Sequence, residues 1–298
     1  MRLVELAQKV AAAPTTLLIT GESGSGKDHL ARLVHELGPR CDAPYLKIDC
    51  ASLPPQLVES ELFGHERGAF TGAVERKLGR FELGGNGTIV LDEVAAVSPG
   101  AQGKLLRVLQ ERSFERLGGT ETLRIEARIM ALTNVNLPAA VKNGQFREDL
   151  YFRLNVLTLT VPPLRERRAD ILPLADHFLA TLRAVHSHPD VQLSEAARRM
   201  LAAYSWPGNV RELRNVLERA VVFSQSDLLE LESFPENMRV ASAGTVGSGA
   251  GLRSLEDIER EVIAATLETT RYQISRSAEI LGISRKTLLE KRKKYGLK

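Results

Sequence analysis

The sequence predicts an α/β core with a parallel β-sheet, followed by a helical segment and a small all-α domain. The first observation is a glycine-rich loop at 21–27, which lies between a short apolar run and a segment with helical spacing. The second is the alternation of strand and helix patterns through residues 1–163. The third is helical periodicity further along the chain, over residues 170–184, 194–203 and 208–223.

The glycine-rich loop has the G-x-x-x-x-G-K pattern. It consists of Gly21, Glu22, Ser23, Gly24, Ser25, Gly26 and Lys27. Between a strand and a helix, backbone N–H groups of such a loop cradle phosphates and the lysine neutralises the outer ones. A chance glycine loop is the alternative, and the flanking strand and helix argue against it. The next residue is Asp28 rather than the Ser or Thr that usually binds Mg²⁺, so we expect the metal to be held largely through water and a second acidic motif.

That second motif is an apolar run at 88–91 that ends in two carboxylates, Asp92 and Glu93. A buried strand that presents acids at its C-terminal end fits the ligand crevice of a parallel sheet. We expect Asp92 to hold Mg²⁺ or its waters and Glu93 to polarise the attacking water. Two acids after an apolar run are common by chance, but the phosphate loop about 65 residues upstream makes the pair specific.

A glycine-bounded hexapeptide lies between these two motifs. It reads Gly68, Ala69, Phe70, Thr71, Gly72 and Ala73. The glycines permit a sharp, mobile turn, and we expect Phe70 to be exposed at its tip, where the ring would pack against another molecule. Taken alone, the hexapeptide favours an ordinary glycine turn with the ring folded into the core.

Together these motifs resemble the AAA+ central domain of the NtrC-type bacterial enhancer-binding proteins, the activators of sigma-54 RNA polymerase. The resemblance runs from about residue 3 to residue 234 almost without gaps. Besides the phosphate loop and the acid that follows its lysine, four segments carry it, at residues 59–73, 105–112, 146–154 and 206–213.

The resemblance implies roles for further residues. Residues 68–73 would be the loop that contacts sigma-54, Asn134 with Thr133 beside it would sense the γ-phosphate, and Arg211 would be the second sensor arginine. Arg147 and Arg153 would complete the site of a neighbouring subunit, although either could be a plain surface arginine. An arginine supplied in trans raises phosphoryl-transfer rates by roughly 10³–10⁵. It also implies a homo-oligomeric ring, a hexamer or heptamer.

The chain departs from the family at two places. Asp49 stands where the family often has an Asn that restrains the catalytic glutamate, and it would repel Glu93 if both were ionised and close. Family members also usually carry a further segment before this part, and commonly a regulatory domain. The sequence leaves open whether this is a shortened chain or a short activator controlled in trans.

The composition excludes several other classes of protein. At 43% hydrophobic and 26% charged residues it is that of an ordinary soluble protein. No apolar run approaches the roughly 18 residues of a membrane span, and the first residues lack the features of a signal peptide. Cys41 and Cys50 form no metal-binding pattern. We expect a cytoplasmic, nucleoid-associated protein without a membrane partner.

The C-terminal residues combine positive charge with a helix-turn-helix pattern. Residues 271–298 contain nine Lys or Arg against two acids, a local excess of +7. Helical spacing over 274–281 and 285–295 flanks a turn at 282–284, in which Ser284 can cap the second helix. The pattern resembles the Fis-type DNA-binding module. The residues expected to face DNA are Arg276, Arg285, Lys286, Thr287 and Lys291.

These observations predict four parts: a nucleotide-binding core at 1–163, a helical lid at 164–235, a flexible linker at 236–252 and the DNA-binding module at 253–298. The expected protein uses ATP and Mg²⁺, binds double-stranded enhancer DNA, and remodels the sigma-54 RNA polymerase holoenzyme, in keeping with a two-component system. One alternative is another AAA+ remodelling ATPase that acts on a different partner. A second is a DNA-binding repressor without useful ATPase activity, against which the intact catalytic residues argue.

Overall fold

The structure is a computed structural model that describes residues 2–186, 191–224, 226–243, 255–270 and 272–296. The chain divides into two compact units, Met1–Ser242 and Ala243–Lys298. The linker expected at 236–252 lies largely outside the described residues. Its first part is helical, because Met238 packs into the core of the preceding helices.

The core of the first unit is a five-stranded, fully parallel sheet with the strand order β2-β5-β8-β1-β9. The strands are β1 (Leu17–Thr20), β2 (Tyr45–Asp49), β5 (Thr88–Asp92), β8 (Arg128–Thr133) and β9 (Leu157–Thr160). In the register of the sheet Asp49 lies opposite Asp92, and Thr20 lies opposite Thr133. The polar ends of the inner strands therefore meet at one edge of the sheet.

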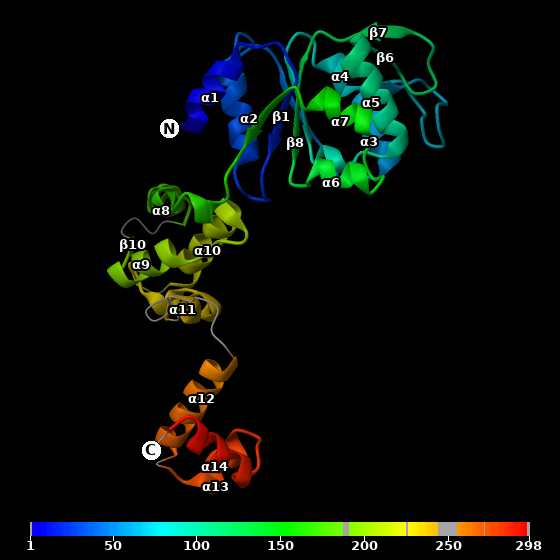
Figure 1. Ribbon diagram of the computed structural model, residues 1–298. Helices are drawn as coiled ribbons and strands as arrows, with labels where there is room; N and C mark the ends of the chain where they lie inside the picture. The colour runs from blue at the N-terminus through cyan, green and yellow to red at the C-terminus, as the bar shows by residue number, and fades with distance from the viewer. Residues whose placement is uncertain (1, 187–190, 225, 244–254, 271, 297–298) are drawn as a thin grey trace. The chain divides into compact units, whose positions relative to one another are not determined.

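Helices cover both faces of this sheet, as Figure 1 shows. One face carries α1 (Arg2–Ala11) and α2 (Lys27–Glu36). The other carries α3 (Pro55–Phe63), α4 (Arg80–Leu83), α5 (Pro99–Glu111), α6 (Leu137–Lys142) and α7 (Glu148–Leu154). Because both faces are covered, the inner strands are apolar throughout, which is typical of parallel sheets.

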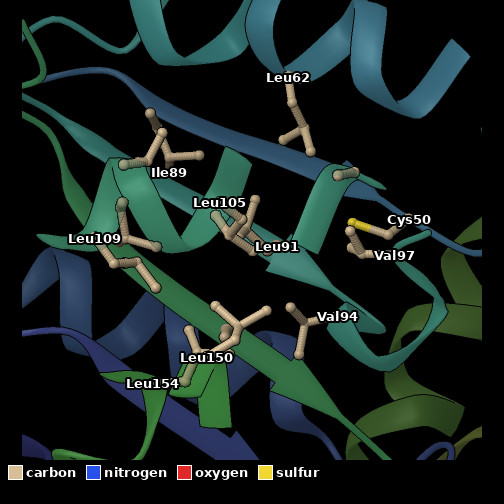
Figure 2. Packing of buried hydrophobic residues seen from close by; sticks show 14 of the residues in the cluster. Cys50, Leu62, Ile89, Leu91, Val94, Val97, Leu105, Leu109, Leu150 and Leu154 are labelled. Atoms are coloured by element: carbon tan, nitrogen blue, oxygen red, sulfur yellow. The ribbon is translucent and has the colours of Figure 1, made fainter. Parts of the chain in front are cut away.

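The second face holds the larger of the two core clusters around the sheet. Leu91 of β5 packs there with Leu105 of α5 and Leu150 of α7 (Figure 2). Leu62 of α3 and Val94 of the short 3₁₀ helix η1 (Val94–Ala96) belong to the same cluster. The apolar packing therefore joins the end of β5 to the helix that leads into the 68–73 hexapeptide.

Two small hairpins extend from this part of the core. The first pairs β3 (Gly64–His65) with β4 (Lys77–Leu78), and the second pairs β6 (Ser113–Glu115) with β7 (Thr122–Arg124). Backbone hydrogen bonds join Glu66 and Gly64 of the first hairpin to Leu117 of the second. The hexapeptide thus begins on a hairpin that its neighbour supports.

The helical lid follows the sheet and has its own apolar core around Trp206, which is fully buried and donates a hydrogen bond from Nε1 to the Leu201 carbonyl (2.9 Å). Its elements are η2 (Leu164–Glu166), η3 (Arg168–Asp170), α8 (Ile171–His186), β10 (Gln192–Leu193), α9 (Glu195–Ala203), α10 (Asn209–Phe223), β11 (Leu228–Leu229), η4 (Leu231–Ser233) and α11 (Glu236–Ala243). The expected helical periodicity of this segment is confirmed.

The second unit consists of α12 (Leu255–Thr269), α13 (Ile274–Ile280) and α14 (Arg285–Lys294). Ala278 and Leu288 are buried together with Ile263 and Leu267 of α12, and Ser284 caps α14 by accepting a hydrogen bond from the Thr287 N–H (3.0 Å). The predicted helix-turn-helix is therefore confirmed. Among the helices that the structure describes, none has both the length and the apolar character needed to cross a bilayer.

Gly64 offers a direct test of the packing at the base of the first hairpin. It has a φ of +73°, and a Cβ there would lie 2.5 Å from the Lys77 carbonyl oxygen. Gly144 has a similar φ of +69°, with nothing within 4 Å of a Cβ. We expect Gly64→Ala to lower the free energy of unfolding by about 2 kcal/mol more than Gly144→Ala, since both positions have a positive φ but only Gly64 adds a backbone clash and has a ψ of 178°, a conformation essentially restricted to glycine.

Urea denaturation of the two variants and the wild type would measure this difference. An equal decrease in the free energy of unfolding for Gly64→Ala and Gly144→Ala would show that the hairpin accommodates the added Cβ without a loss of stability.

Candidate functional site

The phosphate loop connects the end of β1 to the first residue of α2. Gly21, Gly24 and Gly26 have φ values of +152°, +72° and +103°, conformations that side chains disfavour. The loop therefore opens the N-terminus of α2, whose first N–H groups lack helical partners and can bind an anion. Lys27 Nζ donates to the carbonyls of Gly21 (2.9 Å) and Glu22 (3.2 Å), so the ammonium lies at the mouth of the loop.

The acidic end of β5 lies against this loop. Glu93 Oε1 is 3.9 Å from Lys27 Nζ, and Glu93 Oε2 accepts a hydrogen bond from the Asn134 N–H (3.1 Å). Burial lowers the pKa of Lys27, although the charges of Glu93, Asp92 and Asp28 partly oppose this shift. The structure thus brings together Lys27, Asp92, Glu93 and Asn134, which the sequence assigned to one site.

Lys47 of β2 also belongs to this site, and the sequence motifs did not identify it. Its Nζ lies 2.6 Å from Asp28 Oδ1 and 2.7 Å from Asp92 Oδ2. Burial acts to lower the pKa of Lys47, but its hydrogen bonds and its attraction to the two carboxylates prevail and raise it. Strand alternation was the sequence signal that could have identified Lys47, because Lys47 and Asp49 lie on the same face of β2.

Asp49 occupies the position where the family often has Asn. Its Oδ1 accepts a hydrogen bond from the Ala51 N–H (2.9 Å), so the carboxylate closes its own turn. Glu93 is restrained instead by the Asn134 backbone. The two carboxylates consequently have separate hydrogen-bond partners at this edge of the sheet.

The lid contacts the phosphate loop directly. Arg211 Nη1 donates to Ser23 Oγ (2.8 Å), and Asn209 Nδ2 donates to Glu22 Oε2 (3.0 Å). Arg165 binds both carboxylate oxygens of Glu22, at 2.8 and 2.5 Å. Gly24 permits this approach, because a Cβ there would lie 2.5 Å from the backbone oxygen of Gly208. Asn209 and Arg165 are site residues that the sequence reasoning missed.

A cleft of about 390 Å³ lies between the phosphate loop and the lid. Its lining includes Lys27, Asp92 and Glu93 from the core, and Arg211 and Arg214 from α10. A larger hollow of about 730 Å³ lies on the lid around α10 and α11, and it contains none of these groups. The smaller cleft is therefore the candidate site, since it combines concave shape with Lys27 of the phosphate loop and with the Asp92 and Glu93 carboxylates.

The two predicted finger arginines lie outside this cleft. Arg147 precedes α7 and binds both oxygens of Asp149, at 3.0 and 2.7 Å. Arg153 lies in the last turn of α7 and donates from Nε to the Leu109 carbonyl (3.2 Å). Both side chains are exposed, so they are available to a neighbouring molecule.

The hexapeptide forms a closed turn beyond β3. Gly68 N–H donates to the Ala73 carbonyl (2.8 Å), and Gly72 has a φ of +102°. Phe70 is only half-exposed, and its ring packs edge-on against His65 with the centroids 5.0 Å apart. The expectation of an exposed ring is therefore wrong for this structure, because the turn directs Phe70 back onto the hairpin and leaves Thr71 at the surface.

The helix-turn-helix presents a basic surface. Arg276, Arg285 and Lys286 are exposed, and Thr287 is partly exposed because it contacts the Ser284 cap. Lys291 differs from these residues, since its Nζ pairs with Glu259 Oε1 of α12 at 2.5 Å. Lys291 thus also supports the fold of the module.

Three consecutive segments of the chain match known protein families. Residues 1–160, more than half of the chain, match the Sigma-54 interaction domain. Residues 165–249 match the AAA+ ATPase lid domain, and residues 254–295 match the bacterial regulatory proteins of the Fis family.

Two curated relatives illustrate the similarity. The regulatory protein AtoC of Escherichia coli (strain K12) is 45% identical over 296 residues, which cover 97% of this chain and 64% of AtoC. The nitrogen fixation protein AnfA of Azotobacter vinelandii is 44% identical over 294 residues, which cover 98% of this chain and 55% of AnfA. The chain therefore spans less than two thirds of the length of either relative.

Solved structures agree with the predicted fold. NtrX from Brucella abortus in complex with ATP has a TM-score of 0.73 and 34% identity, and the match covers 99% of this chain and 67% of NtrX. Hsp104 has a TM-score of 0.55 at 19% identity, with 74% of this chain and 43% of that chain covered, a similarity of fold alone. The predicted AAA+ core with its helical lid is confirmed.

The contact of Arg165 with Glu22 predicts an acid-sensitive attachment of the lid. Hydrogen bonds from Arg165 and Asn209 lower the pKa of Glu22 from 4.5 to about 2. Because the pKa is lowered in the folded state, the contact stabilises the protein above pH 4.5, and this contribution is lost as the pH falls toward 2. Arg165→Met should therefore be less stable than the wild type near neutral pH, and the difference should shrink on acidification.

Unfolding curves recorded across this pH range would measure the difference. Lys142→Met, which removes one positive charge from α6, is the matched control and should not reproduce the profile. A pH-independent difference for Arg165→Met would contradict a role for ionised Glu22.

Proposed function

The chain belongs to the family defined by the sigma-54 interaction domain, as its motifs predicted, and we propose that it is a transcription activator that hydrolyses ATP to remodel sigma-54 RNA polymerase. The observation that carries the proposal is the cleft that Lys27, Glu93 and Arg211 line together, in which the Asn134 N–H holds the Glu93 carboxylate. Phosphate-binding and water-activating groups are thereby assembled in one place.

In this proposal the nucleotide phosphates lie on the N-terminus of α2. The N–H groups of the loop and Lys27 bind the phosphate oxygens, and Arg211 approaches from the lid. Glu93 orients the attacking water and accepts its proton, while Asn134 positions Glu93 through its backbone. The NtrX structures in complex with ADP and ATP support a nucleotide ligand for the same fold.

The carboxylates beside the loop fit a magnesium ion. Asp28 and Asp92 share one ammonium, so they already provide two oxygen ligands around a cation. Within the described residues no three His, Cys, Asp or Glu side chains gather as a metal site, and Mg²⁺ commonly uses one or two carboxylates with water and phosphate oxygens. When bound there, Mg²⁺ would neutralise charge on the phosphates.

We propose that the active form is a ring, a hexamer or heptamer. Arg147 and Arg153 lie on an exposed segment outside the cleft of their own chain. An arginine that acts in the cleft of a neighbouring subunit has to lie at such an exposed position. The match to AAA+ relatives supports such an assembly. Hydrolysis would then depend on association of the subunits.

The hexapeptide and the C-terminal module would provide the contacts of an activator with sigma-54 and with DNA. The 68–73 hexapeptide would contact sigma-54, with Thr71 at its exposed surface. Residues 253–298 would bind enhancer DNA through the exposed Arg276, Arg285 and Lys286, together with Thr287 and Lys291. We assign residues 1–163 to the nucleotide-binding core and the elements from residue 164 through α11 to the lid.

Two substitutions test the hydrolytic site. Lys27→Ala should abolish nucleotide binding, because it removes the cation at the phosphate loop. Glu93→Gln should retain ATP binding but lower the turnover rate by about 10²–10⁴-fold, since an amide cannot accept the proton of the attacking water. Equilibrium nucleotide binding and phosphate release would be measured for both, with Lys142→Ala as the control. Retained turnover in Glu93→Gln would move the water-activating role elsewhere.

A second test separates ATP hydrolysis from the activation of RNA polymerase. Thr71→Ala and Phe70→Ala should leave ATPase activity within a few-fold of the wild type, because neither residue lines the cleft. Both should abolish open-complex formation by sigma-54 RNA polymerase on a supercoiled promoter. Phe223→Ala removes an exposed ring on α10 and should affect neither property. Parallel loss of ATPase and activation in the hexapeptide variants would make the hexapeptide a structural element rather than a contact surface.

A further inference from the structure

Lys47 is a cation beside the cleft that the proposed hydrolysis does not use. It comes from β2, the edge strand beyond β5, and its side chain reaches the Asp28 and Asp92 carboxylates at 2.6 and 2.7 Å. Asp28 lies in the first turn of α2 and Asp92 at the end of β5. A single ammonium therefore connects three elements at the edge where magnesium would bind.

Both carboxylate oxygens of Asp92 are engaged in this arrangement. Oδ1 accepts a hydrogen bond from the Glu93 N–H (3.1 Å), and Oδ2 faces the Lys47 ammonium. The Asp92 carboxylate is only 15% exposed, so water has little access to it. Oδ2 is the oxygen at which a metal ion, or a water bound to one, would meet the Lys47 ammonium.

We propose that Lys47 is a tethered counter-ion of the magnesium site: its ammonium pairs Asp28 with Asp92 in the absence of metal and gives up Asp92 when Mg²⁺ enters with the nucleotide. This inference rests on the proposed binding of ATP and Mg²⁺. Lys47 acts through the two carboxylates, so it is a positioning residue.

Electrostatics predicts the direction in which a substitution of Lys47 changes the affinity for nucleotide. If Lys47 is removed, less positive charge offsets the Asp28, Asp92 and Glu93 carboxylates. These carboxylates would then repel the incoming phosphates more strongly, and metal-free nucleotide would bind more weakly. With Mg²⁺ present the metal supplies the missing positive charge, so the same substitution should leave the affinity for the nucleotide unchanged. Lys47 therefore sets how strongly nucleotide binding depends on magnesium.

The experiment measures equilibrium binding of a fluorescent, non-hydrolysable ATP analogue to the full chain, once in EDTA and once in saturating Mg²⁺. Lys47→Met should raise the Kd in EDTA by on the order of tenfold, because one nearby positive charge is lost. Its Kd in Mg²⁺ should equal that of the wild type. Lys47→Arg should retain the wild-type affinity in both buffers, since it keeps the charge between the carboxylates.

Lys104→Met is the matched control. Lys104 pairs with Glu59 at 2.7 Å on the surface, so this variant makes the same charge change and breaks an ion pair that is not in the cleft. Its ratio of the two Kd values should be that of the wild type. Thermal unfolding would confirm that each variant is folded, and Lys47→Gln replaces Lys47→Met if the latter is not.

Two results would overturn the inference alone. An equal increase of the Kd in both buffers would mean that Lys47 binds the nucleotide itself, and an unchanged Kd in EDTA would mean that the bridge has no effect on binding. A wild-type chain that binds no nucleotide in either buffer would instead overturn the proposed function, and this inference with it.

Discussion

The parallel register of the sheet is the constraint on which the site depends. Because its strands run in the same direction, the carboxyl ends of β1, β5 and β8 meet at one edge. The phosphate loop leaves β1 there, Asp92 ends β5, and Asn134 follows β8. The apolar interiors of these strands, buried on both faces, fix the register and hence the distances among the polar groups beyond them.

Charge compensation is the second requirement of this edge. Asp28, Asp92 and Glu93 carry like charges and would repel one another if they stood alone. Lys47 pairs with the first two, while Lys27 and the Asn134 N–H face Glu93. These partners therefore offset the negative charge of the carboxylates that the proposed mechanism uses to bind a metal and to accept a proton.

The sequence predicted the features that local patterns encode, and it missed those that depend on neighbouring elements. Glycine spacing and apolar runs located the phosphate loop, the acidic strand end and the helix-turn-helix, because each is specified within a few consecutive residues. The contacts of Lys47, Asn209 and Phe70 depend on which strand, loop or ring lies beside them. No pattern along the chain encodes the pairing of Phe70 with His65, which arises from the closure of the turn.

The packing also suggests how events in the cleft could reach the hexapeptide. Glu93 is followed directly by η1, and Val94 shares a close-packed cluster with Val58 and Leu62 of α3 (Figure 2). Helix α3 ends at Phe63, immediately before β3 and the turn at 68–73. Because close-packed interiors transmit strain, a change in the position of Glu93 would shift α3 and, with it, the hairpin from which the hexapeptide begins. Apolar packing, together with the hydrogen bond from Ser98 to Glu59 of α3, therefore connects the end of β5 to the helix that precedes this turn.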